Sequence, residues 1–157
     1  MDPLNIWLEQ IELWYQTRKH DQGSNLESLI LYPPDQVWGP IISERQSKAI
    51  ACWLDGCLRL FQYQRYQRPD KAYQYLQFAY SKLQQVTINP QSELELKDWC
   101  MKRMQNLIVL SLEFCTQQPN ERWQAESSLL IENHVRFMAA QQWNEPRKYD
   151  QGKSSFH

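Results

Sequence analysis

The strongest chemical signal in the chain is a run in which aromatic rings, amides and arginines alternate, Phe61-Gln-Tyr-Gln-Arg-Tyr-Gln-Arg68. Over residues 61–82 four cations stand against one acid, Asp70, a local balance of +3; the cations are Arg65, Arg68, Lys71 and Lys82. Arginine binds phosphate and aromatic rings stack on exposed bases, so this composition is typical of contact with a nucleic-acid backbone. A structural interpretation competes with it, because glutamine and arginine near a helix end also serve solubility and favour the helix dipole.

A second, smaller basic cluster follows about thirty residues later. It consists of Lys97, Lys102 and Arg103, balanced only by Asp98. At 100° per residue Lys97 falls close to the apolar stripe of its helix, whereas Lys102 and Arg103 point away from that stripe. All three therefore face one groove only if the side chain of Lys97 bends outward along the helix surface.

Catalytic and metal-binding patterns are missing from the sequence. Paired groups such as Glu9 and Glu12 lie one helical turn apart, but nothing indicates the burial that would shift a carboxyl toward acid/base work. With only four glycines in the chain, a glycine-rich phosphate loop is not expected either. We therefore expect no enzyme activity.

The cysteines and histidines do not suggest a cofactor. Cys52, Cys57, Cys100 and Cys115 form no C-x-x-C pair, and the three histidines are scattered along the chain. We expect reduced thiols that pack as small apolar groups, no metal and no cofactor.

Composition points to a helical, folded chain. The 157 residues carry a net charge of -1, aromatic residues make up 13% and Gly only 4 positions. A chain this apolar should fold, and turn-rich β folds need more glycine. The start Met-Asp-Pro is not a secretory leader, and the longest apolar stretch, 107–112, is far too short to cross a membrane. We expect a cytoplasmic protein without a membrane segment.

Hydrophobic periodicity predicts an all-α fold of five helices in one compact domain, residues 1–143, with a flexible tail at 144–157. The first helix follows the Asp2-Pro3 cap, the second follows Ser43, the third begins at Pro69, the fourth covers roughly 91–116 and the fifth ends near Trp143. Residues 20–43 are rich in helix breakers and allow only a short helix at about 25–31. The fourth helix is apolar nearly all round from Leu107 to Leu112, which predicts a central position surrounded by other helices.

Several short motifs resemble the small Q-type antitermination proteins of bacteriophages over roughly residues 4–115. Leu8-Glu-Gln-Ile-Glu-Leu-Trp14 is similar to the opening helix of that family, and Tyr32-Pro33-Pro34 leads into Ile42-Ser-Glu-Arg-Gln-Ser-Lys-Ala-Ile50 as in its second helix, continued by Cys57-Leu-Arg-Leu60. The segment Asp70-Lys-Ala-Tyr-Gln-Tyr-Leu-Gln-Phe-Ala-Tyr80 resembles its aromatic helix, and Lys102-Arg-Met-Gln105 resembles its recognition helix.

The resemblance implies an all-helical regulator that binds duplex DNA at a late promoter, contacts RNA polymerase and lets transcription pass terminators. It further implies Lys97, Trp99, Lys102 and Arg103 as groove-facing residues, with Arg65, Arg68 and Lys71 as phosphate contacts. The sequence departs from the family at Thr87-Ile-Asn-Pro90, where the family has a glycine turn and a short helix. Proline at that point excludes a continuous helix.

A second interpretation is a helical protein-protein adaptor without a nucleic-acid role. Ile6 and Leu13 lie opposite the main apolar stripe of the first helix. They leave hydrophobic surface for a protein partner or a homodimer.

Overall fold

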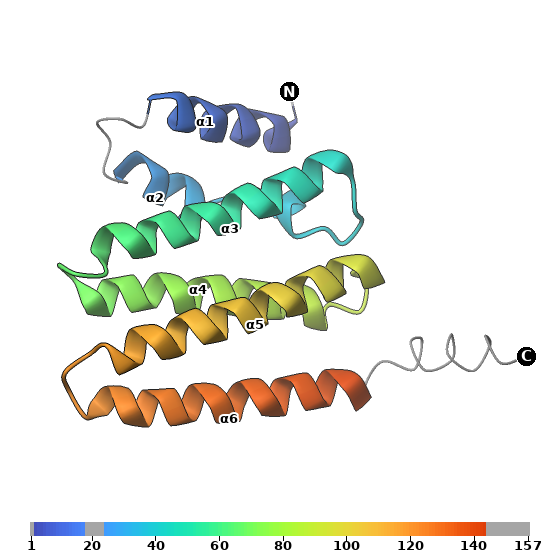
Figure 1. Ribbon diagram of the computed structural model, residues 1–157. Coiled ribbons are helices and arrows are strands. Elements are labelled where there is room, and N and C mark those ends of the chain that lie inside the picture. Colours follow the sequence, from blue (N-terminus) through green and yellow to red (C-terminus); the bar gives the residue numbers. More distant parts are fainter. Residues whose placement is uncertain (1, 18–23, 144–157) are drawn as a thin grey trace, which may run out of the picture. The chain divides into compact units, whose positions relative to one another are not determined.

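The computed structural model describes residues 2–17 and 24–143, which are divided between two compact units, Met1–Leu107 and Ile108–His157. The described part is helical throughout, with six α-helices, one 3-10 helix and no strand (Figure 1). The elements are α1 (Pro3–Thr17), α2 (Ser24–Leu31), η2 (Asp35–Trp38), α3 (Glu44–Gln64), α4 (Pro69–Ile88), α5 (Leu94–Thr116) and α6 (Arg122–Trp143). The all-α prediction is confirmed, and the predicted tail at 144–157 lies outside the described residues.

The short helix expected at about 25–31 is present as α2, and counting it brings the described α-helices to six where five were predicted. Eight residues are too few to hold a helix in water, so α2 depends on packing. Leu26 and Ile30 are completely buried, and Ile30 lies against the backbone of Gly56 in α3. A Cβ at Gly56 would lie 2.8 Å from Cγ1 of Ile30. Because glycine has no Cβ, α2 can pack this closely against α3.

Tryptophans of two neighbouring helices bind the last turn of α2. Nε1 of Trp7 in α1 donates to the carbonyl of Leu29 at 2.9 Å, and Nε1 of Trp53 in α3 donates to the carbonyl of Ile30 at 3.0 Å. The last carbonyls of a helix have no partner within the helix itself. The two indoles satisfy them and fix α2 between α1 and α3.

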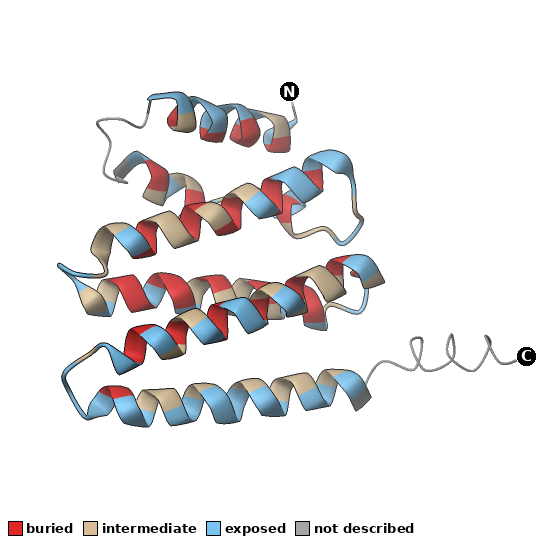
Figure 2. Ribbon diagram, viewed as in Figure 1, coloured by how far each residue is buried: buried red, intermediate tan, exposed pale blue. Residues whose placement is uncertain are grey.

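The helices α3 and α4 confirm the sequence pattern most closely. Ser43 caps α3, its side chain accepting a hydrogen bond from the backbone N–H of Gln46 at 3.0 Å. Hydrophobic spacing predicts one apolar stripe on each helix, and both are buried except for the half-buried Tyr80 (Figure 2). The α3 stripe consists of Ile50, Trp53, Leu54, Cys57, Leu60 and Phe61, and the α4 stripe of Ala72, Tyr73, Leu76, Ala79, Tyr80 and Leu83. The chain reverses at residues 65–68, and the two helices pack along each other.

The charged face of α3 binds α1. Nζ of Lys48 lies 2.5 Å from Oε1 of Glu12, and the hydroxyl of Tyr15 donates to Asp55. Asp55 also accepts from Nε of Arg59 at 2.7 Å. This row of polar contacts joins α1 to α3 beside their shared apolar core.

The prediction that residues 107–112 are surrounded is wrong at Val109, whose surface is 57% exposed. Leu107 and Ile108 are buried, so this part of α5 has an apolar core face and one apolar residue in solvent. In α6 the predicted stripe is half-buried at each position, namely Leu130, His134, Phe137, Met138 and Gln141. None of the described helices is both long and apolar enough to span a membrane.

We predict that Gly56→Ala destabilises the protein although alanine favours helices. Overpacking costs about 1–3 kcal/mol and the gain in helix propensity is about 1 kcal/mol, so the free energy of unfolding should fall. Ile30→Val removes the Cδ1 methyl group closest to the new Cβ, and we expect it to cost less in the Gly56→Ala background than in the parent. Urea unfolding of the four proteins measures this, and a Gly56→Ala variant more stable than the parent would contradict the packing described.

Candidate nucleic-acid interface

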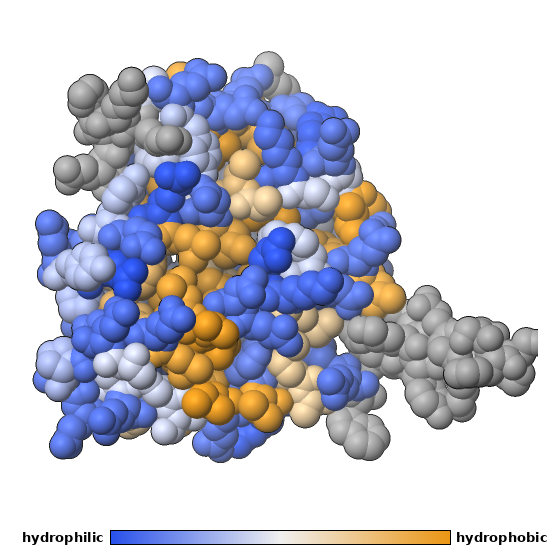
Figure 3. Space-filling view, viewed as in Figure 1, coloured by the Kyte–Doolittle hydropathy of each residue, from blue (hydrophilic) through white to orange (hydrophobic). Residues whose placement is uncertain are grey.

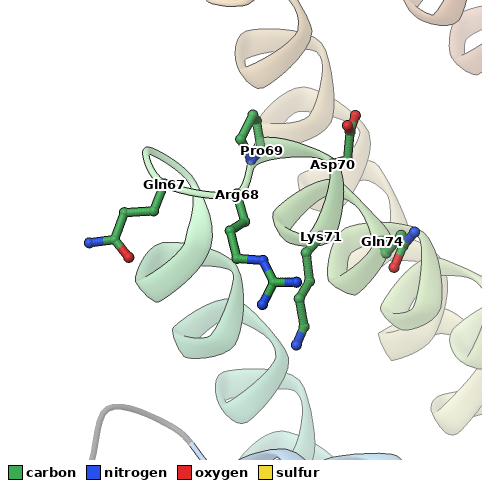
Figure 4. A pocket seen from close by; sticks show the side chains of 6 residues that line it. All are labelled: Gln67, Arg68, Pro69, Asp70, Lys71 and Gln74. Atoms are coloured by element: carbon green, nitrogen blue, oxygen red, sulfur yellow. The ribbon is translucent and has the colours of Figure 1, made fainter.

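The corner between α3 and α4 holds the first group of predicted site residues. Arg65 follows the end of α3, Arg68 is the N-cap of α4, and Lys71 lies in the first turn of α4. Residues 67–71 and Gln74 line an open hollow at this corner. In Figure 4 the side chains of Arg68 and Lys71 point in the same direction, while Asp70 points away from them. The structure therefore brings two cations together, with the acid that is nearest in sequence, Asp70, turned aside.

Arg65 is held between two aromatic rings. Its Cζ lies 5.1 Å from the ring centroid of Phe61 and 5.1 Å from that of Tyr66. Phe61 is completely buried, whereas Tyr66 is 85% exposed. At these distances the guanidinium is attracted to both rings, and the exposed ring of Tyr66 offers a surface on which a base could stack.

The start of α4 adds a favourable electrostatic environment for an anion. Arg68 provides no side-chain hydrogen bond to cap the helix, and Pro69 occupies its first turn. The positive end of the dipole of a twenty-residue helix therefore lies beside Arg68 and Lys71. Phosphate oxygens are well suited to such a combination of N–H groups and cations.

The charge of this corner is smaller than the sequence predicts, because α2 contributes an acid. Oε2 of Glu27 lies 3.5 Å from Nζ of Lys71 and accepts a hydrogen bond from the hydroxyl of Tyr75 at 2.9 Å. Burial, followed by this hydrogen bond, raises the pKa of Tyr75 above its ordinary value, so the phenol stays protonated near neutral pH.

Lys82, counted in the local balance of +3, belongs to another part of α4. It lies eleven residues beyond Lys71, and its Nζ is 5.7 Å from the ring centroid of Trp38 and 5.9 Å from that of Phe78. With Lys82 left out and Glu27 added, three cations face two acids at the corner, a balance of +1. The balance of +3 counted over residues 61–82 therefore does not describe the corner itself, which has a balance of +1.

The second group of predicted site residues lies on the first turns of α5. Cζ of Arg103 is 5.0 Å from the ring centroid of Trp99, one helical turn earlier, and Lys102 beside it is exposed. Lys97 is half-buried. The beginning of α5 is fixed by a hydrogen bond from the N–H of Glu93 to the carbonyl of Pro40 at 3.0 Å. Trp99 and Arg103 thus form a stacked pair next to Lys102.

The structure does not bring the two groups together at one point. Arg68 precedes the first residue of α4, and Lys97 follows the last residue of α4 by nine positions. A helix of twenty residues is about 30 Å long at 1.5 Å per residue. Arg68 and the start of α5 consequently lie at opposite ends of α4.

Reactive groups elsewhere in the described residues are few. Burial raises the pKa of the Cys100 thiol to about 12, and Cys57 is fully buried with its pKa raised by the same cause. A thiol in this state is a packing group rather than a nucleophile. No group of three or more His, Cys, Asp or Glu side chains in the described part of the chain could hold a metal ion.

Sequence reasoning identified the cations and rings but missed Glu27, which lies some forty residues from Lys71 and carries no local signal of its role. Comparison with known proteins adds no further site residue, since no family model, no curated protein and no solved structure matches the chain.

Proposed function

We propose that the chain binds duplex DNA through the α3–α4 corner. The observation that carries this proposal is the common direction of the Arg68 and Lys71 side chains beside the start of α4 (Figure 4). Arg65 lies three residues before Arg68, at the end of α3. Cations and a helix start bind phosphate without reading sequence. These contacts would position the protein on the duplex.

Sequence reading would come from α5, as the resemblance to phage antitermination proteins implies. Stacking on Trp99 orients the guanidinium of Arg103, and an oriented guanidinium is the usual partner of guanine in the major groove. Lys102 would accompany it, and Lys97, which is half-buried, would join them only with its side chain bent outward along the helix. Contact with RNA polymerase and action as an antiterminator belong to the proposal on the strength of the resemblance alone.

An adaptor without a nucleic-acid role is the second candidate, and one observation favours it. Ile6 is 40% exposed and Leu13 is 59% exposed, and the two lie on the same outward face of α1. Exposed apolar residues at this spacing suit a partner helix.

Selection of bound duplexes from a random pool, combined with binding at several salt concentrations, separates the two candidates. A DNA-binding protein enriches a defined site and loses affinity as salt rises, because phosphate contacts release counterions. The parent protein should do both. Absence of binding to any duplex at low salt would rule out the DNA proposal and leave the adaptor.

Substitutions in the two groups of residues should change duplex binding in different ways. Arg68→Ala should weaken selected and random duplexes alike and reduce the slope of log K against log salt by about one, because it removes one phosphate contact. Arg103→Ala should cost about 1–3 kcal/mol on the selected site and little on random duplex. Arg45→Ala removes the same charge at the far end of α3 and serves as the control. Equal affinities for all of these variants and the parent would contradict the assignment.

Glu27→Gln should strengthen binding to any duplex. The change removes the carboxylate that lies 3.5 Å from Nζ of Lys71, so the corner repels phosphate less. Glu44→Gln alters the net charge equally but lies at the opposite end of α3, where we expect no effect. Fluorescence anisotropy with a labelled duplex at low salt measures both variants. A Glu27→Gln variant that binds no better than Glu44→Gln would place the phosphate contacts elsewhere.

A further inference from the structure

An exposed apolar surface lies on the described part of the second unit, residues 108–143. Figure 3 shows apolar side chains gathered over the last turns of α5 and the middle of α6. The large exposed apolar residues in these elements include Val109 (57%), Ile131 (49%) and Val135 (61%). Ile131 and Val135 are one turn apart and share a face of α6. We call Val109, Ile131 and Val135 the apolar patch.

The helix α6 lacks the burial that a helix of its length ordinarily has. Of its described side chains only Trp123 is buried, and its ring packs edge-on against Phe114 of α5 at 5.4 Å between centroids. The stripe that ends at Gln141 is only half-buried. Helices in water are stabilised mainly by packing of an apolar face, so a two-helix unit with this small core gains from further helices.

The charges beside the patch identify the partner that fits. Glu132 and Arg136 form an exposed ion pair at 2.8 Å, with side chains that are 60% and 72% exposed. The base, Arg136, lies one helical turn after the acid, Glu132, along α6. A second α6 running in the opposite direction about a twofold axis between these residues places each Glu132 opposite the Arg136 of the other copy. The same surface is therefore complementary to itself, as a twofold symmetric interface requires.

We propose that this chain forms a homodimer through the apolar patch, with the two α6 helices antiparallel. Two hairpins of α5 and α6 then make a four-helix arrangement in which Ile131 and Val135 are covered. The proposal is independent of DNA binding, because the corner and the α5 cluster described above lie in the first unit.

The molar mass of the full chain over a range of concentrations, measured by sedimentation, tests the proposal. The parent should change from monomer to dimer mass as concentration rises. Ile131→Glu and Val135→Glu should each weaken the association constant at least about tenfold. Leu129→Glu is the matched control, since Leu129 is also exposed (51%) but points more than about 100° away from both residues on the helical wheel. Circular dichroism checks that each variant keeps its helices.

Charge exchange tests the predicted orientation of the two helices. Glu132→Arg leaves two bases on the flank of α6 and Arg136→Glu leaves two acids, so each variant alone should dimerise less than the parent. An equimolar mixture should form a mixed dimer, which no contact within one chain explains. A monomer mass for the parent at every concentration, equal losses for Leu129→Glu and Ile131→Glu, or a mixture that stays monomeric would each overturn the proposal.

Discussion

The packing of α1, α2, α3 and α4 depends on how the last carbonyls of α2 are satisfied. The indole N–H groups of Trp7 and Trp53 bind two consecutive carbonyls, at Leu29 and Ile30. An unpaired polar group in this core would cost about 1–3 kcal/mol. Moving α1 or α3 away from α2 would therefore leave a carbonyl and an indole N–H unpaired and lower the stability of the fold. Trp53 also packs against Trp38 of η2 at 4.6 Å and Phe78 of α4 at 5.8 Å between ring centroids. One tryptophan thereby joins the end of α2 to three other elements.

The position of α2 in turn determines the electrostatics of the α3–α4 corner. Gly56 lets Ile30 approach α3, and in that position Glu27, one turn earlier on α2, reaches Lys71 and Tyr75. The carboxylate lowers the balance of charge at the corner from +2 to +1. For the DNA binding proposed above, a moderate charge would limit affinity for non-specific duplex, because each phosphate contact adds affinity for every sequence.

Much of the fold could be predicted from the sequence where one helix face decides the outcome. Ser43 with Gln46, and the stripes of α3 and α4, contain local information that the structure confirms. The sequence indicates α2 as a short helix, but the contacts that hold it could not be predicted, because they come from Gly56 and two tryptophans far away in sequence. The balance of the corner was misjudged for the same reason, since Glu27 approaches only through tertiary packing. At Val109 periodicity cannot distinguish an apolar residue in the core from one in solvent.

Among the described helices, α1 and α6 each expose more than one large apolar residue, and the surroundings of these residues differ in a way that matters for association. On α1 the side chains of Ile6 and Leu13 are separated by the exposed Glu9 and Gln10, so each contributes an isolated apolar spot. On α6 Ile131 and Val135 are one turn apart, and apolar side chains from the end of α5 continue the surface (Figure 3). Hydrophobic association scales with the contiguous apolar area removed from water. Association through α6 therefore buries more contiguous apolar area and is stabilised more than association through α1.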